Sequence, residues 1–297
     1  MTQSQRVATA AFIGTGLMGA PMVRRLLAAG IAVRVWNRTH AKLAPLIQVG
    51  AVPAASPADA VADTDAVCLC LTDATAVEMV LFGEGGVARA ANPPPLLVDF
   101  STIGPEATRA LAARLRALSR MSWVDAPVSG GATGAQDGRL VIFCGGSSED
   151  VERLTPLFGA LAQRVTHVGH LGTGQTLKLC NQLIVATNLV AIAEALSLAR
   201  DSGLKVQVIP DALRGGFADS QPLQIFGRRM AEGSVLPVLG ELGLMLKDLR
   251  RVDDLATQQR SELPLTRAAL GIYRQAEAKD LLGQDLAALI SLYPACN

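Results

Sequence analysis

One short segment of the chain places a cation and two amides in surroundings that are otherwise apolar. Between Thr176 and Ala199 nearly every position carries an apolar side chain, and a helix that is apolar on all sides is normally buried. Lys178, Asn181 and Gln182 interrupt this pattern at i, i+3 and i+4, so a helix presents them on one face. Because an unpaired lysine in a dry interior is costly, this face is predicted to line a cleft that admits a polar ligand. The competing interpretation is a lysine near a helix end whose ammonium reaches solvent.

A second candidate site follows an apolar, strand-like run near the start of the chain. Gly14, Gly16 and Gly19 form the pattern G-x-G-x-x-G, and a helical segment follows directly. The first glycine permits a tight turn, the second lets the backbone approach a pyrophosphate, and the third lets the helix pack on the strand. The motif predicts dinucleotide binding at a helix N-terminus, against the alternative of a glycine-rich turn without a ligand. The predicted contacts are Gly14, Thr15, Gly16, Leu17, Met18 and Gly19.

The residues that follow the second predicted strand indicate which coenzyme is preferred. NAD-specific sites usually carry an acidic residue about 20 positions after the glycine motif, where it binds the ribose hydroxyls. This chain has Asn37, Arg38 and Thr39 there, and no carboxylate that would repel a 2′-phosphate. The planar guanidinium of Arg38 can meet a phosphate, and Asn37 and Thr39 can donate further hydrogen bonds. We therefore predict a preference for NADP(H), with NAD as the second choice. The alternative is that Arg38 is a solvated loop arginine.

The bulk composition excludes several classes of protein. The chain has 297 residues, enough for two domains or one large one. Half of its residues are hydrophobic and 18% are charged, which is typical of a folded protein rather than a disordered one. The net charge of +1 gives no global field that would attract nucleic acid or an acidic membrane.

The cysteines and the apolar segments indicate the compartment. Five cysteines without CxxC spacing predict neither a disulfide framework nor a zinc site, and we expect no metal. They fit a reducing compartment. The N-terminal segment lacks a signal-peptide pattern, and no window of 18 or more residues stays apolar without Lys, Glu, Asn or Gln. We therefore expect a soluble, cytoplasmic protein without a membrane span.

The order of the predicted elements indicates two domains. Strand-like runs alternate with Ala- and Leu-rich helical segments in the first half, which predicts βαβ units and a parallel sheet with helices on both faces. The strand-like runs end near Gly169, so we predict an α/β domain over residues 1–169 and an all-α domain over residues 170–297, with a long helix crossing the boundary. The predicted strands are Val7–Ile13, Ala32–Trp36, Ala66–Leu71, Leu96–Phe100, Trp123–Asp125, Leu140–Cys144 and Val165–Val168. The predicted helices are Met18–Ala29, Thr75–Leu81, Pro105–Leu118, Glu149–Ala160, Gln175–Arg200, Val206–Leu213, Pro222–Ala231, Leu242–Gln259, Pro264–Ala278 and Gln284–Leu292.

Four sequence blocks spread over nearly the whole chain match one known family. They are FIGTGLMGAPM (Phe12–Met22), DFSTIGP (Asp99–Pro105), DAPVSGGATGAQDGRL (Asp125–Leu140) and GTGQTLKLCNQ (Gly172–Gln182). With MLKDL and LPLT further on, they resemble the β-hydroxyacid dehydrogenases, which include 3-hydroxyisobutyrate dehydrogenase and tartronate semialdehyde reductase (2-hydroxy-3-oxopropionate reductase). The resemblance implies a Rossmann domain with a doubly wound sheet, followed by an all-α domain joined through a long interdomain helix.

The resemblance also implies roles for individual residues. Lys178 corresponds to the catalytic lysine, and Asn181 and Gln182 to neighbours that hold the substrate and the lysine. The loop of Ser129, Gly130 and Gly131 corresponds to the one that binds the substrate carboxylate. A hydroxyl with unhindered backbone N–H groups suits that role, although a glycine turn alone would be ordinary. The remaining implied contacts, with the cofactor or at the closing side of the cleft, are Leu71, Thr72, Thr102 and Lys247.

The expected activity is an NADP(H)-dependent interconversion of a short 3-hydroxy acid with its aldehyde or keto partner. Asn181-Gln182 and the segment RGGFADS (Arg214–Ser220) look most like the tartronate semialdehyde reductase branch. The alternatives are 3-hydroxyisobutyrate or another 3- or 4-hydroxyacid dehydrogenase, an imine reductase, and a non-enzymatic dinucleotide-binding module. Imine reductases usually carry Asp or Tyr at the position of Lys178, and the non-enzymatic modules tend to lose the lysine. The family resemblance further implies a homodimer or homotetramer.

Two departures from the family pattern bear on the pocket. Where relatives often have a proline, this chain has Leu71-Thr72-Asp73, so Asp73 would either weaken anion binding or cap the next helix. Gly240 replaces an aromatic residue common in relatives, which bears on the shape of the nicotinamide side of the pocket and hence on the substrate. Asp125 is expected to be a structural residue that ties its loop. A solvated surface pair of Lys247 with Asp248 competes with a role of Lys247 in the site.

Overall fold

The computed structural model describes residues 7–294, so Cys296 and the segment before Val7 lie outside the described residues. The chain divides into two compact units, Met1–Lys178 and Leu179–Asn297. The division falls inside the long helix, directly after Lys178.

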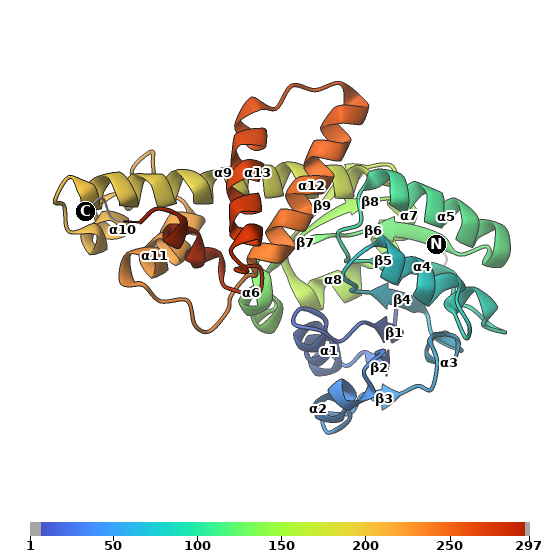
Figure 1. Cartoon of the computed structure of the whole chain (residues 1–297). Coiled ribbons are helices and arrows are strands. Elements are labelled where there is room, and N and C mark those ends of the chain that lie inside the picture. The colour runs from blue at the N-terminus through green and yellow to red at the C-terminus, as the bar shows by residue number, and fades with distance from the viewer. Residues whose placement is uncertain (1–6, 295–297) are drawn as a thin grey trace. The chain divides into compact units, whose positions relative to one another are not determined.

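The first unit is built on one sheet, in which nine strands lie within the described residues (Figure 1). Six parallel strands follow the order β3-β2-β1-β4-β5-β6, the order of doubly wound dinucleotide-binding sheets. In such a sheet the ligand lies at the carboxyl ends of the strands, where the order reverses, and here the reversal falls between β1 and β4. The bounds of these strands are β1 Thr9–Ile13, β2 Ala32–Trp36, β3 Val52–Pro53, β4 Ala66–Leu69, β5 Leu96–Asp99 and β6 Ser122–Asp125.

Beyond β6 the sheet is no longer purely parallel. Strand β8 (Leu140–Gly145) runs antiparallel to β6 and to β7 (Val128–Ser129), and parallel to β9 (Ala162–Gly169). The prediction of a parallel sheet is therefore correct for the first six strands and wrong for this edge. Strands β3 and β7, of two residues each, were not predicted because two residues show no alternation of apolar and polar side chains.

Alternate residues of the strands supply two apolar cores, one on each face of the sheet. Phe12 of β1 lies in one core and its neighbour Ile13 in the other, as expected where a sheet is covered on both faces. Helices α1 (Gly19–Ala28) and α8 (Thr155–Leu161) contribute to the first core. Helices α4 (Ala74–Phe82) and α5 (Pro105–Ser119) contribute to the second. The predicted α/β architecture is confirmed.

The remaining helices of this unit are short. They are α2 (Ala44–Ile47), α3 (Pro57–Val61), α6 (Gly131–Asp137) and α7 (Ser148–Arg153). The prediction of one helix over Glu149–Ala160 is wrong, because α7 ends at Arg153 and α8 begins at Thr155. Pro156 lies in the first turn of α8, where its missing N–H is tolerated, and it would break a continuous helix.

The second unit is built of helices joined by loops, with one isolated β-bridge between Glu241 and Asp285 among its described residues. Helix α9 (Thr173–Asp201) begins in the first unit and supplies Ala186, Leu189 and Leu196 to the core of the second. This core includes the fully buried Tyr273. The bounds predicted for α12 (Leu242–Gln259) and α13 (Pro264–Ala278) agree with the structure. The other elements are α10 (Ile209–Ala212), a π-helical segment Leu223–Gly227, α11 (Arg228–Glu232) and 3₁₀ segments Val206–Val208 and Leu286–Leu292.

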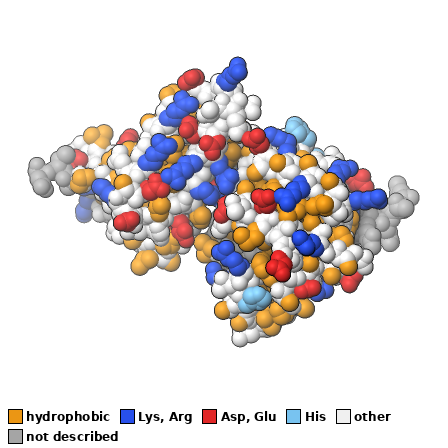
Figure 2. Space-filling model, turned by 45° about the vertical axis from the view of Figure 1, so that its right-hand side comes forward, with side chains coloured by type: hydrophobic (Ala, Val, Ile, Leu, Met, Phe, Trp, Pro, Cys, Tyr) orange, Lys and Arg blue, Asp and Glu red, His pale blue; other side chains and the backbone are white. Residues whose placement is uncertain are grey.

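Helix α9 is the one described helix that is long and apolar enough, by length and composition alone, to cross a membrane. A core helix of a soluble protein passes the same test. In α9, 39% of the most apolar 18-residue stretch is buried inside the protein. The sequence-based expectation differed because it treated each Lys, Glu, Asn or Gln as an interruption. Figure 2 shows acidic and basic side chains interspersed on the visible face, in keeping with the net charge of +1.

Candidate functional site

The three glycines of the motif serve different purposes in the structure. Gly14 has φ +98°, and a side chain there would overlap the carbonyl oxygen of Cys70. A side chain at Gly19 would overlap the carbonyl oxygen of Gly14. At Gly16, in contrast, no described heavy atom apart from Gly16 itself and its two chain neighbours lies within 4 Å of the position that a Cβ would take. The packing of the protein explains Gly14 and Gly19 but does not require Gly16, so the open space beside Gly16 fits a ligand that approaches the backbone.

The helix that follows the motif is suited to an anion. Helix α1 is described throughout, and it has neither a side-chain cap nor an acidic residue in its first turn. The N–H groups of Ala20 and Met22 already donate to the carbonyl oxygens of Gly16 and Met18, so the start of α1 offers a phosphate mainly the positive end of the helix dipole. Together with the open side of Gly16, this end of α1 fits the pyrophosphate of a dinucleotide.

The end of β2 braces the glycine loop. The backbone N–H of Thr15 donates to Asn37 Oδ1 at 3.1 Å, and Asn37 Nδ2 donates to the carbonyl oxygen of Thr39 at 3.0 Å. The sequence predicted Asn37 as a donor to the cofactor, whereas the structure also gives it an internal bracing role. Arg38 and Thr39 are exposed. Within residues 7–294, Arg38 forms no hydrogen bond or ion pair.

The segment after β4 resolves one of the two departures noted in the sequence. Asp73 Oδ1 accepts from the backbone N–H of Ala76 at 2.8 Å, and Asp73 Oδ2 accepts from Thr72 Oγ1 at 2.9 Å. Asp73 is thus the N-cap of α4, which is the second of the two roles expected for it. The backbone N–H of Leu71 donates to Ser101 Oγ at 2.9 Å and ties this segment to the loop after β5.

Two buried acids lie side by side where β5 and β6 end. Asp99 and Asp125 are register partners, and both are fully buried. Burial raises the pKa of Asp99 to about 7; hydrogen bonds from Ser101 lower it, and the nearby Asp125 raises it further. Burial likewise raises the pKa of Asp125 to about 6, even though this carboxylate accepts several backbone N–H groups. The sequence alone does not indicate a role for Asp99, because the burial of Asp99 depends on chain segments remote in sequence.

Asp125 anchors the start of the helix that carries Lys178. Its Oδ1 accepts from the N–H of Gly172 at 2.7 Å, and its Oδ2 accepts from the N–H of Gln175 at 2.8 Å. These are two of the N–H groups that a helix start leaves without an intrahelical partner. The expected structural role of Asp125 is therefore confirmed. Lys178, three residues after Gln175, is 8% exposed and is the last residue of the first unit.

The loop predicted to bind the substrate carboxylate lies between β7 and α6. Ser129 ends β7 and is half-buried, whereas Gly130 and Gly131 are exposed. Gly130 has φ +124° and Gly131 has φ +62°, conformations that favour glycine. The backbone at this turn thus explains both glycines and leaves their N–H groups unshielded by side chains.

In the second unit the predicted residues form a polar chain of their own. Asn181 Nδ2 donates to Gln182 Oε1 at 3.0 Å, and Gln182 Nε2 donates to Asp248 Oδ2 at 2.7 Å. Lys247 Nζ lies 3.2 Å from Asp248 Oδ1, an ion pair without hydrogen-bond geometry. The pair named by the competing interpretation is therefore present, but Asp248 is only 5% exposed and Lys247 is half-buried, so the pair is only partly solvated. The role of Lys247 in the site stays a prediction. Sequence reasoning gave Asp248 no role of its own in the site, since its link to Gln182 joins two helices.

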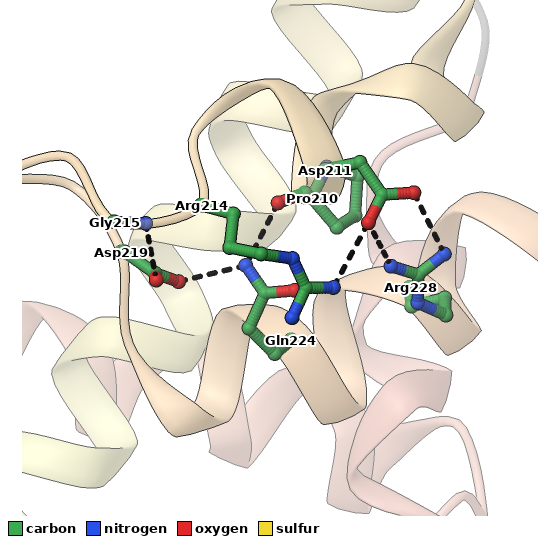
Figure 3. A network of polar contacts seen from close by, with 7 residues as sticks. All are labelled: Pro210, Asp211, Arg214, Gly215, Asp219, Gln224 and Arg228. Carbon is green, nitrogen blue, oxygen red and sulfur yellow. Dashed lines mark hydrogen bonds and ion pairs between the residues drawn. The ribbon is translucent and has the colours of Figure 1, made fainter.

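The segment Arg214–Ser220 is held by a separate polar network (Figure 3). Asp211 forms ion pairs with Arg214 at 2.9 Å and Arg228 at 2.7 Å, and hydrogen bonds from these arginines, that of Arg228 first, lower the pKa of Asp211 to about 2. Asp219 accepts from the Gly215 N–H and from Gln224 Nε2, both at 2.7 Å. The segment is therefore tied at both of its ends.

Both parts of the chain match family models of NAD-binding domains. A family model described as the NAD binding domain of 6-phosphogluconate dehydrogenase matches residues 9–169, and one described as NAD-binding of NADP-dependent 3-hydroxyisobutyrate dehydrogenase matches residues 172–293. The 2-hydroxy-3-oxopropionate reductase of Escherichia coli K12 is 36% identical over 94% of both chains. An NAD-dependent L-serine dehydrogenase of Pseudomonas aeruginosa is 34% identical, over 89% of this chain and 90% of the relative.

Solved structures agree with these sequence matches. The 3-hydroxyisobutyrate dehydrogenase of Salmonella typhimurium superposes with a TM-score of 0.87 at 30% identity, covering 96% of this chain and 99% of that one. The structure of Psf3 in complex with NADP+ and 2-OPP gives the same TM-score at 27% identity, covering 96% of this chain and 100% of that one.

The chain belongs to the β-hydroxyacid dehydrogenase family. It is an NAD(P)-dependent hydroxyacid dehydrogenase, with a Rossmann-type sheet followed by a helical region. The open side of Gly16 and the uncapped start of α1 fit the dinucleotide of such an enzyme. Among the described residues no group of three or more His, Cys, Asp or Glu side chains is placed to hold a metal.

Proposed function

We propose that this protein is an NADPH-preferring reductase of short 3-oxo acids, most similar in activity to 2-hydroxy-3-oxopropionate reductase. The observation that carries the proposal is Lys178, a buried lysine whose helix is fixed at its start by Asp125. A buried amine is the kind of group that family relatives use to move a proton to or from a hydroxy acid. The same unit holds the glycine loop, so the amine and the coenzyme-binding residues share one scaffold.

The chain supplies proton transfer and orientation. Bound NADPH supplies the hydride, which is chemistry that no side chain can provide. In the reductive direction the Lys178 ammonium donates its proton to the substrate oxygen and stabilises the negative charge that develops there. In the oxidative direction the neutral amine accepts the proton of the hydroxyl group. A positioned proton donor contributes roughly 10²–10⁴ in rate.

The substrate-binding residues would act through hydrogen bonds. Ser129, Gly130 and Gly131 present a hydroxyl and unshielded N–H groups, which suit a carboxylate. Gln182 is held by Asp248, so its amide is oriented before the substrate arrives. We assign Asn181, Gln182 and Lys247 to substrate contacts. Thr102, Leu71, Thr72 and Lys247 are assigned to the coenzyme side.

Replacement of Lys178 tests this function. Lys178→Ala should lower kcat for the best substrate of a hydroxy-acid and semialdehyde panel by roughly 10²–10⁴. The NADPH dissociation constant, measured by coenzyme fluorescence, should stay within about twofold because the glycine loop is untouched. Lys279→Ala, at an exposed lysine, is the matched control. Retained turnover in Lys178→Ala contradicts the proposal, and turnover of a cyclic imine but no carbonyl substrate would favour an imine reductase.

The coenzyme preference is assigned to Arg38. Its guanidinium is exposed at the end of β2, beside the glycine loop that Asn37 braces. Arg38→Asp should raise the KM for NADPH far more than the KM for NADH, since the aspartate repels a 2′-phosphate and accepts from ribose hydroxyls. Arg116→Asp, at an exposed arginine of α5, should change neither value. Equal effects of Arg38→Asp on both coenzymes would refute the assignment.

We further propose a homodimer or homotetramer that assembles through α9. Apolar and small side chains recur on its exposed face at spacings suited to helix packing. They are Cys180, Ile184, Ala191, Ala195 and Leu198, with Ile184 64% and Leu198 71% exposed. A second copy presents the same stripe, so two helices can cover each other. Ile184→Glu should shift the sedimentation coefficient to that of a smaller species, whereas Leu118→Glu, at an exposed leucine of α5, should not.

We also propose a cytoplasmic location. The cysteines at Cys68, Cys70, Cys144 and Cys180 are free thiols, which suit a reducing compartment.

A further inference from the structure

One buried amide joins the loop after β5 to the helix that carries Lys178. Gln175 is fully buried in the first turns of α9. Its Oε1 accepts from the backbone N–H groups of Ile103 at 3.0 Å and Gly104 at 3.1 Å. Its Nε2 donates to the carbonyl oxygen of Ser101 at 2.8 Å. A single side chain thus binds three backbone groups that flank Thr102 on both sides.

The loop held in this way exposes only one residue. Ser101, Ile103, Gly104 and Pro105 are buried, whereas Thr102 between them is half-exposed. Because the backbone is fastened on either side of Thr102, this side chain is fixed at the tip of the loop. Thr102 is the residue that we assign to the nicotinamide side of the coenzyme.

The other end of the connection is equally constrained. The N–H of Gln175 donates to Asp125 Oδ2, so the residue is bound through its backbone as well as its side chain. Gly174, the residue before it, lies so close to strand β8 that a Cβ there would overlap the carbonyl oxygen of Phe143. The first turn of α9 therefore lies directly against the sheet, and the Asp125 side chain bonds its N–H groups there. Lys178 follows Gln175 by three residues, about one helical turn.

We propose that Gln175 is a positioning residue for the hydride-transfer reaction, which fixes the spacing between Thr102 and the amine of Lys178. The inference rests on the proposed function and adds to it a residue that contacts neither coenzyme nor substrate. Its amide is suited to this role because it both accepts and donates. Leucine would fill the same volume and remove all three hydrogen bonds, whereas glutamate retains the acceptor for Ile103 and Gly104 and loses the donor to Ser101.

The test compares Gln175→Leu and Gln175→Glu with the wild-type enzyme and with Val33→Ala, a core variant in β2. A misplacement of about 1 Å near the reacting atoms lowers the rate by about 10²-fold, so Gln175→Leu should reduce kcat on that scale. The KM for NADPH should change by less than about threefold, because the glycine loop is unaltered. Gln175→Glu should fall between wild type and Gln175→Leu.

The primary isotope effect with NADPH deuterated at the transferred hydride separates positioning from loss of folded protein. A positioning defect slows the chemical step, so the isotope effect on kcat should rise in Gln175→Leu. Val33→Ala reduces only the fraction of active enzyme, so its isotope effect should equal that of the wild type. An unchanged kcat in Gln175→Leu, or a lowered kcat with an unchanged isotope effect, overturns the inference.

Hydrogen exchange distinguishes a failure of this inference from a failure of the proposed function. If the wild type turns over no hydroxy acid of the panel, the proposed function fails. The positioning role is then judged by amide exchange over residues 101–104, measured with and without NADPH. Faster exchange in Gln175→Leu, together with loss of the protection that NADPH gives the wild type, supports the role. If amide exchange over residues 101–104 in Gln175→Leu equals that of the wild type, both with and without NADPH, the positioning role is overturned.

Discussion

Replacement of Asp99 by asparagine should make the first unit more stable at alkaline pH. Asp99 is fully buried, its Oδ1 accepts from the N–H of Ser101 at 2.9 Å, and its Oδ2 has no hydrogen-bond partner among the described residues. Burial raises the pKa of this carboxyl to about 7, whereas an unfolded aspartate titrates near 3.9. Between these values the folded state binds the proton that the unfolded state has released.

The sign and size of the effect follow from this difference. Because the folded pKa is raised, the contribution of Asp99 to stability is greatest below about pH 4 and declines as the pH rises through about 7. A difference of about three pH units, at about 1.4 kcal/mol each, gives on the order of 4 kcal/mol. Asparagine has the shape of the protonated acid and does not ionise, so Asp99→Asn should avoid this loss.

Urea unfolding from pH 4.5 to pH 8, followed by the fluorescence of Trp36 and Trp123, measures the effect. The free energy of unfolding of Asp99→Asn should equal that of the wild type at the acid end and exceed it at the alkaline end. Asp63→Asn, at an exposed aspartate with φ +58°, is the control and should follow the wild type. The pKa of Asp125 is also raised, so the part of the pH dependence of the unfolding free energy that comes from Asp125 should remain in both variants. If Asp99→Asn shows the wild-type slope, or is less stable at pH 8, the reasoning about this buried carboxyl is wrong.

Three further substitutions separate folding from coenzyme binding. Gly14→Ala should lower Tm and abolish NADPH binding, because its side chain meets the Cys70 carbonyl at a φ that disfavours alanine. Gly16→Ala should leave Tm unchanged and still weaken NADPH binding by fluorescence titration, since no described atom is near its Cβ position; wild-type affinity would contradict the ligand role of Gly16. Asp73→Ala should cost about 1 kcal/mol in unfolding experiments through loss of the α4 cap, and an unchanged NADPH affinity would show that Asp73 does not oppose the coenzyme.

The fold was largely predictable because its elements carry local signals. Alternation of strands and helices identified the parallel sheet, and the apolar periodicity of Leu242–Gln259 and Pro264–Ala278 defined α12 and α13 to the residue. Prediction failed where the signal is short or interrupted. Strand β7 spans two residues, and Pro156 divides a segment that otherwise reads as one helix.

The candidate site was less predictable than the fold, because its supporting contacts join segments that lie far apart in sequence. The sequence identified Lys178 from a cation on an apolar helix; its side chain is 8% exposed, and the cleft that its face is predicted to line stays a prediction. It did not indicate that Gln175 binds a loop more than 70 residues earlier, or that Asp248 orients Gln182 from another helix. Such roles depend on which backbone groups the folded chain brings within 3 Å of a side chain, and periodicity carries no information about this.

The end of the first compact unit at Lys178 has a consequence for how substrate range can change. The proposed proton donor, the coenzyme loop and the proposed carboxylate loop of Ser129, Gly130 and Gly131 belong to one unit. Asn181, Gln182 and Lys247, which we assign to further substrate contacts, belong to the other. Mutations that alter substrate choice can therefore accumulate in the second unit while the catalytic apparatus of the first is inherited intact. This separation offers a physical reason why relatives at similar identity carry names as different as 2-hydroxy-3-oxopropionate reductase and L-serine dehydrogenase. Directed evolution toward a new hydroxy acid would accordingly begin with a library confined to residues 179–294.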